Sequence, residues 1–295
     1  KPMSALLRTD DGALWVPVAG AGLGYLRSDW RDVAQFSRSG GVLEGDFYRA
    51  LAPAHGGGVW LGAYNGVVEH IDAAGEIAAF GDDVRDRLRD VRMFSLIQDK
   101  QGALWVGAPG RLLRVSFDGA IDEWNRRRGD SQVPPGYIDI LRVAPDGSLW
   151  LSSQGGGVQQ RDPATGAVLH TWPAGEGSAV GNGETEAMAF DGDGQPWIAT
   201  AAGLARLDAA SGEFVTVDAT AGTRVFAFDF DGPDALWLQR LSGLERFERG
   251  EGGWQRTDMA GVADGLPSVG AAGLRVDGQH RVWMSTSRGL YRWTP

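Results

Sequence analysis

Short runs in which apolar and polar residues alternate recur along the whole chain, as at residues 225–230 and 271–276. Alternation over five or six residues is the period of a β-strand with one buried face. In most cases a turn rich in Asp and Gly comes next, and then a second apolar run that contains a tryptophan. Asp-Gly turns form tight hairpins because Gly adopts positive φ and Asp bonds back to the backbone. The pattern therefore predicts pairs of antiparallel strands, each pair joined by a hairpin.

Seven tryptophans give this pattern a regular period. They occupy equivalent places in the repeats and are Trp15, Trp60, Trp105, Trp150, Trp197, Trp237 and Trp283. Consecutive members of the series are 45, 45, 45, 47, 40 and 46 residues apart. In five repeats a glycine before an apolar residue predicts a second turn and a third strand, at Gly66, Gly157, Gly203, Gly243 and Gly289. An aromatic residue further on marks a fourth strand at Phe80, Trp124, Trp172, Phe214 and Trp254.

Four short strands in each repeat of about 45 residues are typical of a propeller blade. A helical solenoid of similar period needs runs of 10–15 residues at a 3.6-residue period, and these strands are too short for that. We therefore predict an all-β chain that forms one domain over residues 1–295, a seven-bladed β-propeller of four-stranded antiparallel blades. One blade cannot bury both of its faces alone, so the repeated tryptophans are interpreted as core between blades.

The seventh repeat leaves the closure of the ring open. It stops at residues 293–295, after its third strand. Its fourth strand is either missing, supplied by the first residues, or located beyond this chain. Because an open seam would leave unpaired backbone groups at a sheet edge, we expect residues 1–4 to help close it.

The last repeat also carries a long composite signature. It reads Asp-Gly-Leu-Pro-Ser at 264–268, Asp-Gly at 277–278, Val-Trp-Met-Ser-Thr at 282–286 and Gly-Leu-Tyr-Arg at 289–292. This signature resembles the two-component regulator propeller repeat, and the fifth repeat is similar over 191–206. The second and sixth repeats depart from it, with His-Gly-Gly-Gly at 55–58 and Gly-Pro-Asp at 232–234.

The resemblance implies the extracytoplasmic sensor domain of a bacterial receptor, located in the periplasm. Members of that family often carry two propellers in tandem, followed by an immunoglobulin-like domain, a membrane helix and a cytoplasmic output. The output is typically a histidine kinase or a diguanylate cyclase. None of these parts is present in this chain, and it has one ring where the family often has two.

Composition narrows the function further. The chain of 295 residues has 45 Gly and 12 Trp, which suits many short strands joined by tight turns. It has no cysteine, which excludes disulfides and cysteine metal sites. The formal net charge of −10 argues against a nucleic-acid-binding surface. No run of 18 or more apolar residues occurs, so we expect no direct membrane insertion by this chain.

Signals of catalysis are weak. The four histidines, His55, His70, His170 and His280, occupy different places relative to the repeat tryptophans, so a shared metal site is not expected. The Asp-rich turns at 191–194 and 229–232 lack the downstream glutamate of a calcium loop. No serine-nucleophile, phosphate-loop or dinucleotide motif appears in its required context. We predict no catalytic residue, no metal and no cofactor, so this domain is not expected to be an enzyme.

A binding face is predicted at one rim of the ring. In a propeller, the loops that enter the innermost strand share a rim with the loops between the second and third strands. The entering loops are long and varied here, at 40–47, 81–92, 126–137, 174–186 and 258–268, which points to function at that rim. The candidate ligand-binding residues are Tyr48, Arg49, Tyr64, Asn65, Arg92, Arg111, Tyr137, Gln154, Glu186, Arg224, Arg240 and Arg288. Aromatic rings and planar donors suit a carbohydrate or a small anion.

Three functions follow, in order of preference. The first is a non-catalytic sensor that recognises an oligosaccharide or another small molecule. The second is a scaffold ring that forms a homodimer or packs against a second propeller or an immunoglobulin-like domain. The third is a propeller lyase of the streptogramin-inactivating type, which shares the Asp-Gly-x-Leu-Trp turn. A lyase would need a His/Glu pair in the channel, for which His70 and His170 are the candidates.

Overall fold

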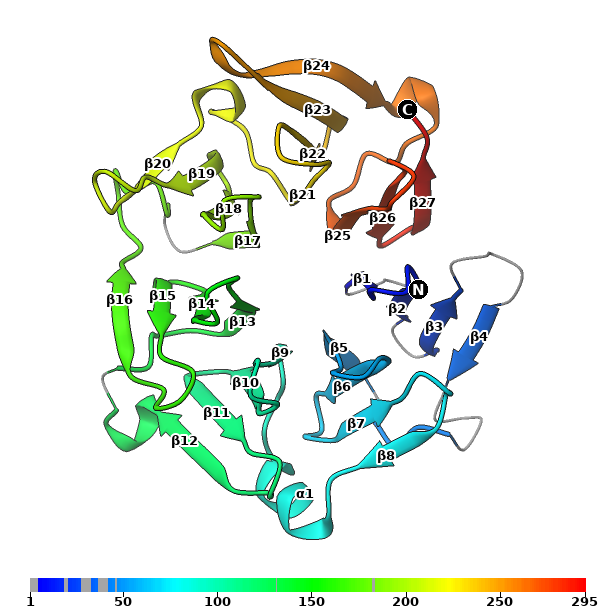
Figure 1. Cartoon of the computed structure of the whole chain (residues 1–295), viewed down its shortest axis with the longest axis vertical. Helices are drawn as coiled ribbons and strands as arrows, with labels where there is room; N and C mark the ends of the chain where they lie inside the picture. Colours follow the sequence, from blue (N-terminus) through cyan, green and yellow to red (C-terminus); the bar gives the residue numbers. More distant parts are fainter. Residues whose placement is uncertain are drawn as a thin grey trace.

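Seven small antiparallel sheets surround a central axis in the computed structural model of the chain (Figure 1). It describes residues 5–18, 21–27, 33–36, 42–45, 47–130, 132–181 and 184–295. Within these ranges six sheets have four strands and one has three, and all neighbouring strands are antiparallel. The prediction of a seven-bladed, all-β propeller is therefore confirmed.

The strands follow the sequence from the inside of each blade to its outside. Blade 1 has β1 (Leu7–Arg8), β2 (Leu14–Val18), β3 (Gly22–Leu26) and β4 (Val33–Phe36). Blade 2 has β5 (Tyr48–Pro53), β6 (Val59–Ala63), β7 (Val68–Ile71) and β8 (Ile77–Ala79). Blade 3 has β9 (Ser95–Gln98), β10 (Leu104–Ala108), β11 (Arg111–Val115) and β12 (Ile121–Asn125). Blade 4 has β13 (Ile138–Val143), β14 (Leu149–Ser153), β15 (Gly157–Arg161) and β16 (Val168–Trp172).

The remaining blades keep the same order. Blade 5 has β17 (Thr185–Phe190), β18 (Pro196–Thr200), β19 (Gly203–Leu207) and β20 (Phe214–Thr216). Blade 6 has β21 (Ala227–Phe230), β22 (Ala235–Arg240), β23 (Gly243–Gly250) and β24 (Gly253–Gly261), and blade 7 has β25 (Ala271–Val276), β26 (Val282–Thr286) and β27 (Gly289–Trp293). Short helices lie in loops: α1 (Asp82–Leu88), η1 (Arg126–Arg128), η2 (Asp218–Thr220) and η3 (Val262–Asp264). In the described part, no helix is long and apolar enough to cross a membrane.

An aspartate fixes the first hairpin to the tryptophan in three blades. The carboxylate of Asp99 accepts hydrogen bonds from the backbone N–H of Gln101 and Ala103, and from Trp105 Nε1 at 2.8 Å. Asp191 and Asp277 bind the tryptophan six residues later in the same way, also at 2.8 Å. The turn aspartate thus orients the indole as well as the turn, a role that the sequence analysis did not assign.

The last hairpin differs from its predicted form. In five other blades the residue three positions before the tryptophan is a glycine with positive φ, such as Gly102 at 92°. In blade 7 this place is held by His280, with φ of 61°, and not by Gly278. His280 also contacts Asp231 of blade 6, Nδ1 to Oδ1, at 2.5 Å. The turn is therefore shifted two residues from the expected Asp-Gly pair.

The repeated tryptophans lie in the core between blades, as predicted. The described residues form seven buried apolar clusters, and each cluster contains side chains of two neighbouring blades. Trp105 and Trp237 are fully buried. Trp150 stacks on Trp172 of its own fourth strand, with ring centroids 5.0 Å apart. Aromatic stacking within a blade and apolar packing between blades together hold the ring.

The seam between blades 7 and 1 is closed by packing. Within the described ranges no fourth strand pairs with β27, so blade 7 has three strands. The expected contribution of residues 1–4 lies outside the described residues. Leu6 packs against Gly273 of β25, where an added Cβ would lie 3.0 Å from the Leu6 Cβ, and it shares a buried cluster with Trp283. Burial of apolar side chains at this seam stabilises the closed ring.

Candidate functional site

The two predicted kinds of loop meet at one end of the ring. The turn after β6 bonds to the loop that enters β5, because Tyr64 N–H donates to the Phe47 carbonyl at 3.0 Å. In the same way, Gln154 N–H donates to the Tyr137 carbonyl at 2.9 Å. Backbone bonds of this kind hold loops from different parts of each repeat in fixed relative positions. Hydrogen bonds between loops therefore give the rim a defined backbone geometry.

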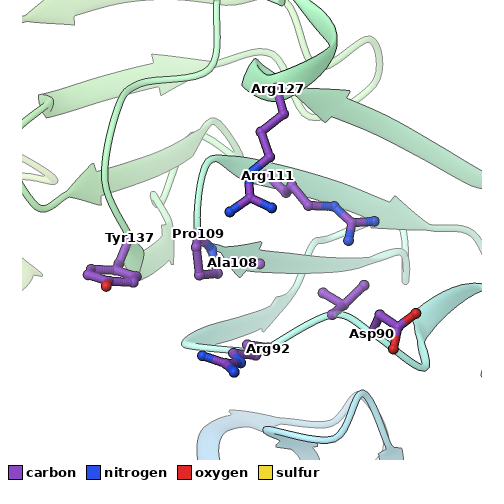
Figure 2. A pocket seen from close by; sticks show the side chains of 8 residues that line it. Asp90, Arg92, Ala108, Pro109, Arg111, Arg127 and Tyr137 are labelled. Atoms are coloured by element: carbon purple, nitrogen blue, oxygen red, sulfur yellow. The ribbon is translucent and has the colours of Figure 1, made fainter.

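A continuous groove lies on this rim over blades 2, 3 and 4. One hollow of about 640 Å³ is lined by Tyr64, Asn65, Arg92, Phe94 and Tyr137. A second hollow of about 410 Å³ shares Arg92 and Tyr137 with the first. Figure 2 shows Arg92, Arg111 and Arg127 around Pro109, with Tyr137 on one side and Asp90 on the other. We call this surface the rim groove and define it by Tyr64, Asn65, Asp90, Arg92, Phe94, Pro109, Arg111, Arg127 and Tyr137.

A row of aromatic rings forms the inner wall of the rim groove. Phe47 stacks on Tyr64 at 5.0 Å, Tyr64 meets Phe94 edge-on at 5.3 Å, and Phe94 stacks on Tyr137 at 4.8 Å. The Arg49 guanidinium lies 4.8 Å from the centre of the Phe94 ring, within the range of a cation–π contact. Tyr137 keeps 43% of its surface exposed. An exposed ring in a supported row is a suitable platform for a sugar ring or another flat group.

Guanidinium groups line the opposite side of the rim groove. Arg111 is held by Glu123, with Nε to Oε1 at 2.8 Å. Burial tends to raise the pKa of Glu123, but the Asn125 amide and Arg111 outweigh it and the pKa is lowered. Arg92 and Arg127 are exposed, and neither guanidinium has a hydrogen-bond or ion-pair partner among the described residues. Two such groups can bind a carboxylate, sulfate or phosphate through paired N–H donors.

Five of the twelve predicted residues meet in the rim groove: Tyr64, Asn65, Arg92, Arg111 and Tyr137. Arg49 and Glu186 line the central channel instead. Arg224 pairs with Glu184 and, at 3.3 Å, with Glu186. Gln154 and Arg288 are exposed but do not line the rim groove.

Two further candidates are buried inside blades. Tyr48 is 5% exposed; its hydroxyl donates to Glu69 and accepts from the Gly45 N–H at 2.7 Å. Burial and Glu69 both raise the pKa of Tyr48. Arg240 is 6% exposed and donates to the Thr220 carbonyl at 2.7 Å. Side chains alternate along a strand, so one position next to a rim residue can point into the core.

The sequence analysis missed Phe94, Arg127 and Asp90. Phe94 could have been found, because it stands eleven residues before its repeat tryptophan, as do the predicted Arg49 and Glu186. Arg127 lies in the short helix η1, which places its side chain over the groove (Figure 2). No sequence pattern predicted that direction.

Below the rim, the innermost strands surround a channel cavity of about 710 Å³. The strand register shifts at Arg49, Asp139 and Glu186, which are β-bulges where the inner strands begin. Bulges redirect side chains, and they often do so beside functional sites. Asp139 Oδ1 is buried and has no hydrogen-bond partner in the described part of the chain. Burial raises the pKa of Asp139 to about 7, although the nearby Arg49 charge opposes this.

The histidines do not form the channel pair that a lyase would need. His70 lies on the third strand β7 and stacks on Trp60 at 4.6 Å. His170 lies on the fourth strand β16 and contacts the Trp172 ring at 4.2 Å. Neither lines the channel cavity. Among the described residues, no group of three or more His, Cys, Asp or Glu side chains could hold a metal ion.

Comparison with known proteins shows the fold. No protein-family model and no curated protein matches the sequence. Virginiamycin B lyase from Staphylococcus aureus is similar in structure, with a TM-score of 0.72, 15% identity, and coverage of 99% of this chain and 94% of the lyase. YCF48 bound to a D1 peptide has a TM-score of 0.70 and 15% identity, and the match covers 100% of this chain and 93% of YCF48.

The extracellular domain of a two component system is similar to about the same degree. The extracellular domain of BT3049, assigned to the hybrid two component systems of B. thetaiotaomicron, has a TM-score of 0.71 and 15% identity. The match covers 99% of this chain but only 39% of that one. A lyase, a protein bound to a peptide and the extracellular domain of a two component system thus share this fold, so the fold alone does not decide the function.

Proposed function

We propose that this chain is the non-catalytic ligand-recognition domain of a bacterial extracytoplasmic receptor, located in the periplasm. The rim groove carries the proposal, because it combines a supported row of aromatic rings with the guanidinium groups of Arg92 and Arg127, which have no partner in the described part of the chain. Grooves that join apolar platforms to a few convergent polar groups are typical ligand sites. In this proposal, the signal passes to a histidine kinase or diguanylate cyclase output outside this chain.

Two observations support the receptor setting. The repeat signature at 264–292 resembles the two-component regulator propeller, and the ring has the same fold as the extracellular domain of BT3049. The chain spans about two fifths of that sensor, which fits one ring of a longer receptor. A second propeller or an immunoglobulin-like domain of the same receptor is the proposed structural partner.

The ligand that fits the rim groove best is an oligosaccharide or another small molecule that carries an acidic group. The exposed face of Tyr137 would stack on a ring of the ligand, and Arg92 with Arg127 would bind its anion. A neutral oligosaccharide would use the aromatic row and Asn65 but would leave both arginines unpaired. An acidic ligand is therefore preferred.

A thermal-shift screen of the purified domain against acidic and neutral oligosaccharides and organic acids tests this proposal. Ligand at about 100 times its Kd stabilises a protein by about 2.7 kcal/mol, which gives a readable rise in Tm. We expect Tyr137→Ala and Arg92→Ala to weaken binding by about tenfold or more, or about 1.4 kcal/mol. Arg249→Ala, on the exposed β23–β24 hairpin of blade 6, is the matched control and should bind normally.

The opposite results have clear meanings. Ligand binding that survives both rim substitutions would contradict a site in the rim groove. A complete lack of binding, together with a tight dimer of the isolated ring in light scattering, would favour the scaffold function instead. Turnover of a bound ligand would contradict the non-catalytic proposal.

A further inference from the structure

Three arginines from three different blades line the channel cavity on the side away from the rim groove. They are Arg8 of β1, Arg142 of β13 and Arg275 of β25. Arg142 and Arg275 each stand eight residues before their repeat tryptophan, and Arg8 stands seven before Trp15. Arg142 and Arg275 pair directly with their repeat tryptophans and so lie at equal height in the ring, whereas Arg8 pairs with Leu14 and lies one residue further along its strand. None of the three was a predicted site residue.

One carboxylate lies at the same level. Asp229 of β21 also stands eight residues before its tryptophan, and its charge interacts with Arg275 and Arg8. Its Oδ2 is engaged by the Val276 N–H at 2.9 Å, and Asp229 does not line the cavity. Among the described residues, three arginines therefore line the cavity at this depth, whereas Asp229, the acid beside them, does not.

The positive charge is not compensated by ion pairs. No carboxylate of the described residues lies within ion-pair distance of Arg8, Arg142 or Arg275. Burial and the Arg275 charge together lower the pKa of Arg142 to about 10, although the Asp229 charge opposes this. Buried charges that have no counter-charge are costly, so proteins normally pair them. A bound anion would remove that cost.

Most N–H donors of these arginines also have no hydrogen-bond partner among the described residues. A guanidinium has five N–H groups. Arg142 donates to the Met188 carbonyl at 3.0 Å and to the Leu141 carbonyl at 2.8 Å, and Arg275 donates to the Leu274 carbonyl at 2.7 Å. Arg8 Nε is buried with no hydrogen-bond partner in the described part of the chain. The remaining donors can bind oxygen atoms of a ligand in the cavity.

Two acidic residues, Glu186 and Asp139, also line this cavity. They lie nearer the rim, and each has an arginine close to it. Glu186 lies 3.3 Å from Arg224. The charge of Arg49 acts on Asp139. Both acids stand eleven residues before their tryptophans, three residues closer to the rim than Arg142 and Arg275. The surplus of positive charge is thus confined to the deeper part of the channel.

We propose that the deep channel, at Arg8, Arg142 and Arg275, is a binding site for the carboxylate or phosphate group of a small organic molecule. Paired N–H donors of guanidinium groups match the oxygens of both anions. Leu7, Leu51 and Ile97 line the same cavity and would contact the apolar body of the molecule. The volume of about 710 Å³ is in the range of small-molecule sites. This site is separate from the rim groove and does not depend on the proposed sensor function.

Isothermal titration at low ionic strength, with citrate and with inorganic phosphate as separate probes, tests this site. We expect saturable binding of one anion per chain, and the tighter probe identifies a carboxylate or a phosphate site. Arg275→Ala should weaken binding at least tenfold. Arg249→Ala removes an exposed arginine of blade 6 that is outside both sites, and it should leave Kd unchanged.

A second variant guards against loss of binding through poor folding. Asp229→Asn removes the one carboxylate at this level while its amide oxygen can still accept from Val276. We expect it to tighten binding several-fold, a gain that a damaged fold would not give. The proposal is overturned if neither probe binds the wild-type chain, or if Kd is equal in wild type and Arg275→Ala. It is also overturned if Arg92→Ala abolishes binding and Arg275→Ala does not, because the anion then sits in the rim groove.

Discussion

Buried carboxylates have two different roles in this ring, at the scale of single residues. Asp99 is fully buried and accepts three hydrogen bonds, so its charge is compensated by the hairpin and the indole that it holds. Asp139 is buried at a bulge and has an oxygen with no partner among the described residues. A hydrogen-bonded carboxylate stabilises its surroundings, whereas an unpaired one favours the protonated form.

The pKa of Asp139, raised to about 7, makes stability depend on pH. In the folded state the Asp139 carboxyl keeps its proton up to about pH 7. In the unfolded chain the same carboxyl loses its proton near pH 4. The native state therefore binds more protons between these values, and stability falls as pH rises from about 4 to 7. Asp139→Asn should remove this pH-dependent loss of stability, which is up to about 4 kcal/mol. The variant should therefore be more stable than wild type at pH 8.

Urea unfolding of both proteins at pH 4, 6 and 8 measures this effect. Asp118→Asn is the matched control, because Asp118 is exposed and accepts one turn hydrogen bond, from Ala120 N–H at 3.0 Å. It should follow the wild-type pH dependence. If the free energy of unfolding depends on pH in the same way for wild type and Asp139→Asn, then Asp139 is ionised at neutral pH and the charge of Arg49 compensates for its burial.

At the scale of elements, blades 3 and 4 approach each other closely near the rim. Ser95 Oγ of β9 donates to the Ile138 carbonyl of β13 at 2.8 Å. Gly107 of β10 makes this approach possible, since an added Cβ would lie 2.5 Å from the same carbonyl oxygen. Pro109, which follows β10, and Tyr137, which precedes β13, both line the rim groove, so this contact lies between two blades that form it.

Gly107→Ala should lower the free energy of unfolding by about 2–3 kcal/mol, because the added methyl group forces backbone of the two blades apart. Chemical denaturation measures the loss. At Gly175, an added Cβ would meet no atom within 4 Å and φ is not positive, so Gly175→Ala should change stability by less than about 0.5 kcal/mol. Equal effects of the two substitutions would mean that blades 3 and 4 have room to separate at no cost.

At the scale of the whole molecule, the ring is closed unevenly. Six blades have four strands, while β27 of blade 7 has no outer partner within the described ranges. The seam instead depends on apolar packing of Leu6, Leu14 and Val16 around Trp283. Side-chain packing can hold two blades together, but it does not satisfy the backbone groups of an edge strand.

Hydrogen exchange should reveal this difference along the ring. We expect amides of β27 that point away from β26 to exchange at least about tenfold faster than amides of β19, which pairs with strands on both sides. Mass spectrometry of peptides over 289–293 and 203–207 gives the comparison. Equal protection would show that another segment covers the outer edge of β27.

Much of this architecture was predictable because it depends on patterns between residues that are close together in the sequence. The spacing of the tryptophans and the alternation of the strands specify four short strands per repeat, and seven repeats specify the ring. The chemistry of the rim was partly predictable too, since Tyr64, Arg92 and Tyr137 lie in loops that the topology brings to one end. Their types and their places in the repeat were enough to propose a polar and aromatic binding face.

The tertiary structure decided which side chains meet. Tyr48 and Arg49 are neighbours in sequence, yet one is buried against Glu69 and the other faces the channel at a bulge. The deep arginines Arg8, Arg142 and Arg275 come together although more than 130 residues separate each from the next. The sequence by itself determined the repeat, because strand period and turn chemistry are local properties. Only the folded ring could set the register of each bulge and the level of each side chain, because these depend on how distant blades pack.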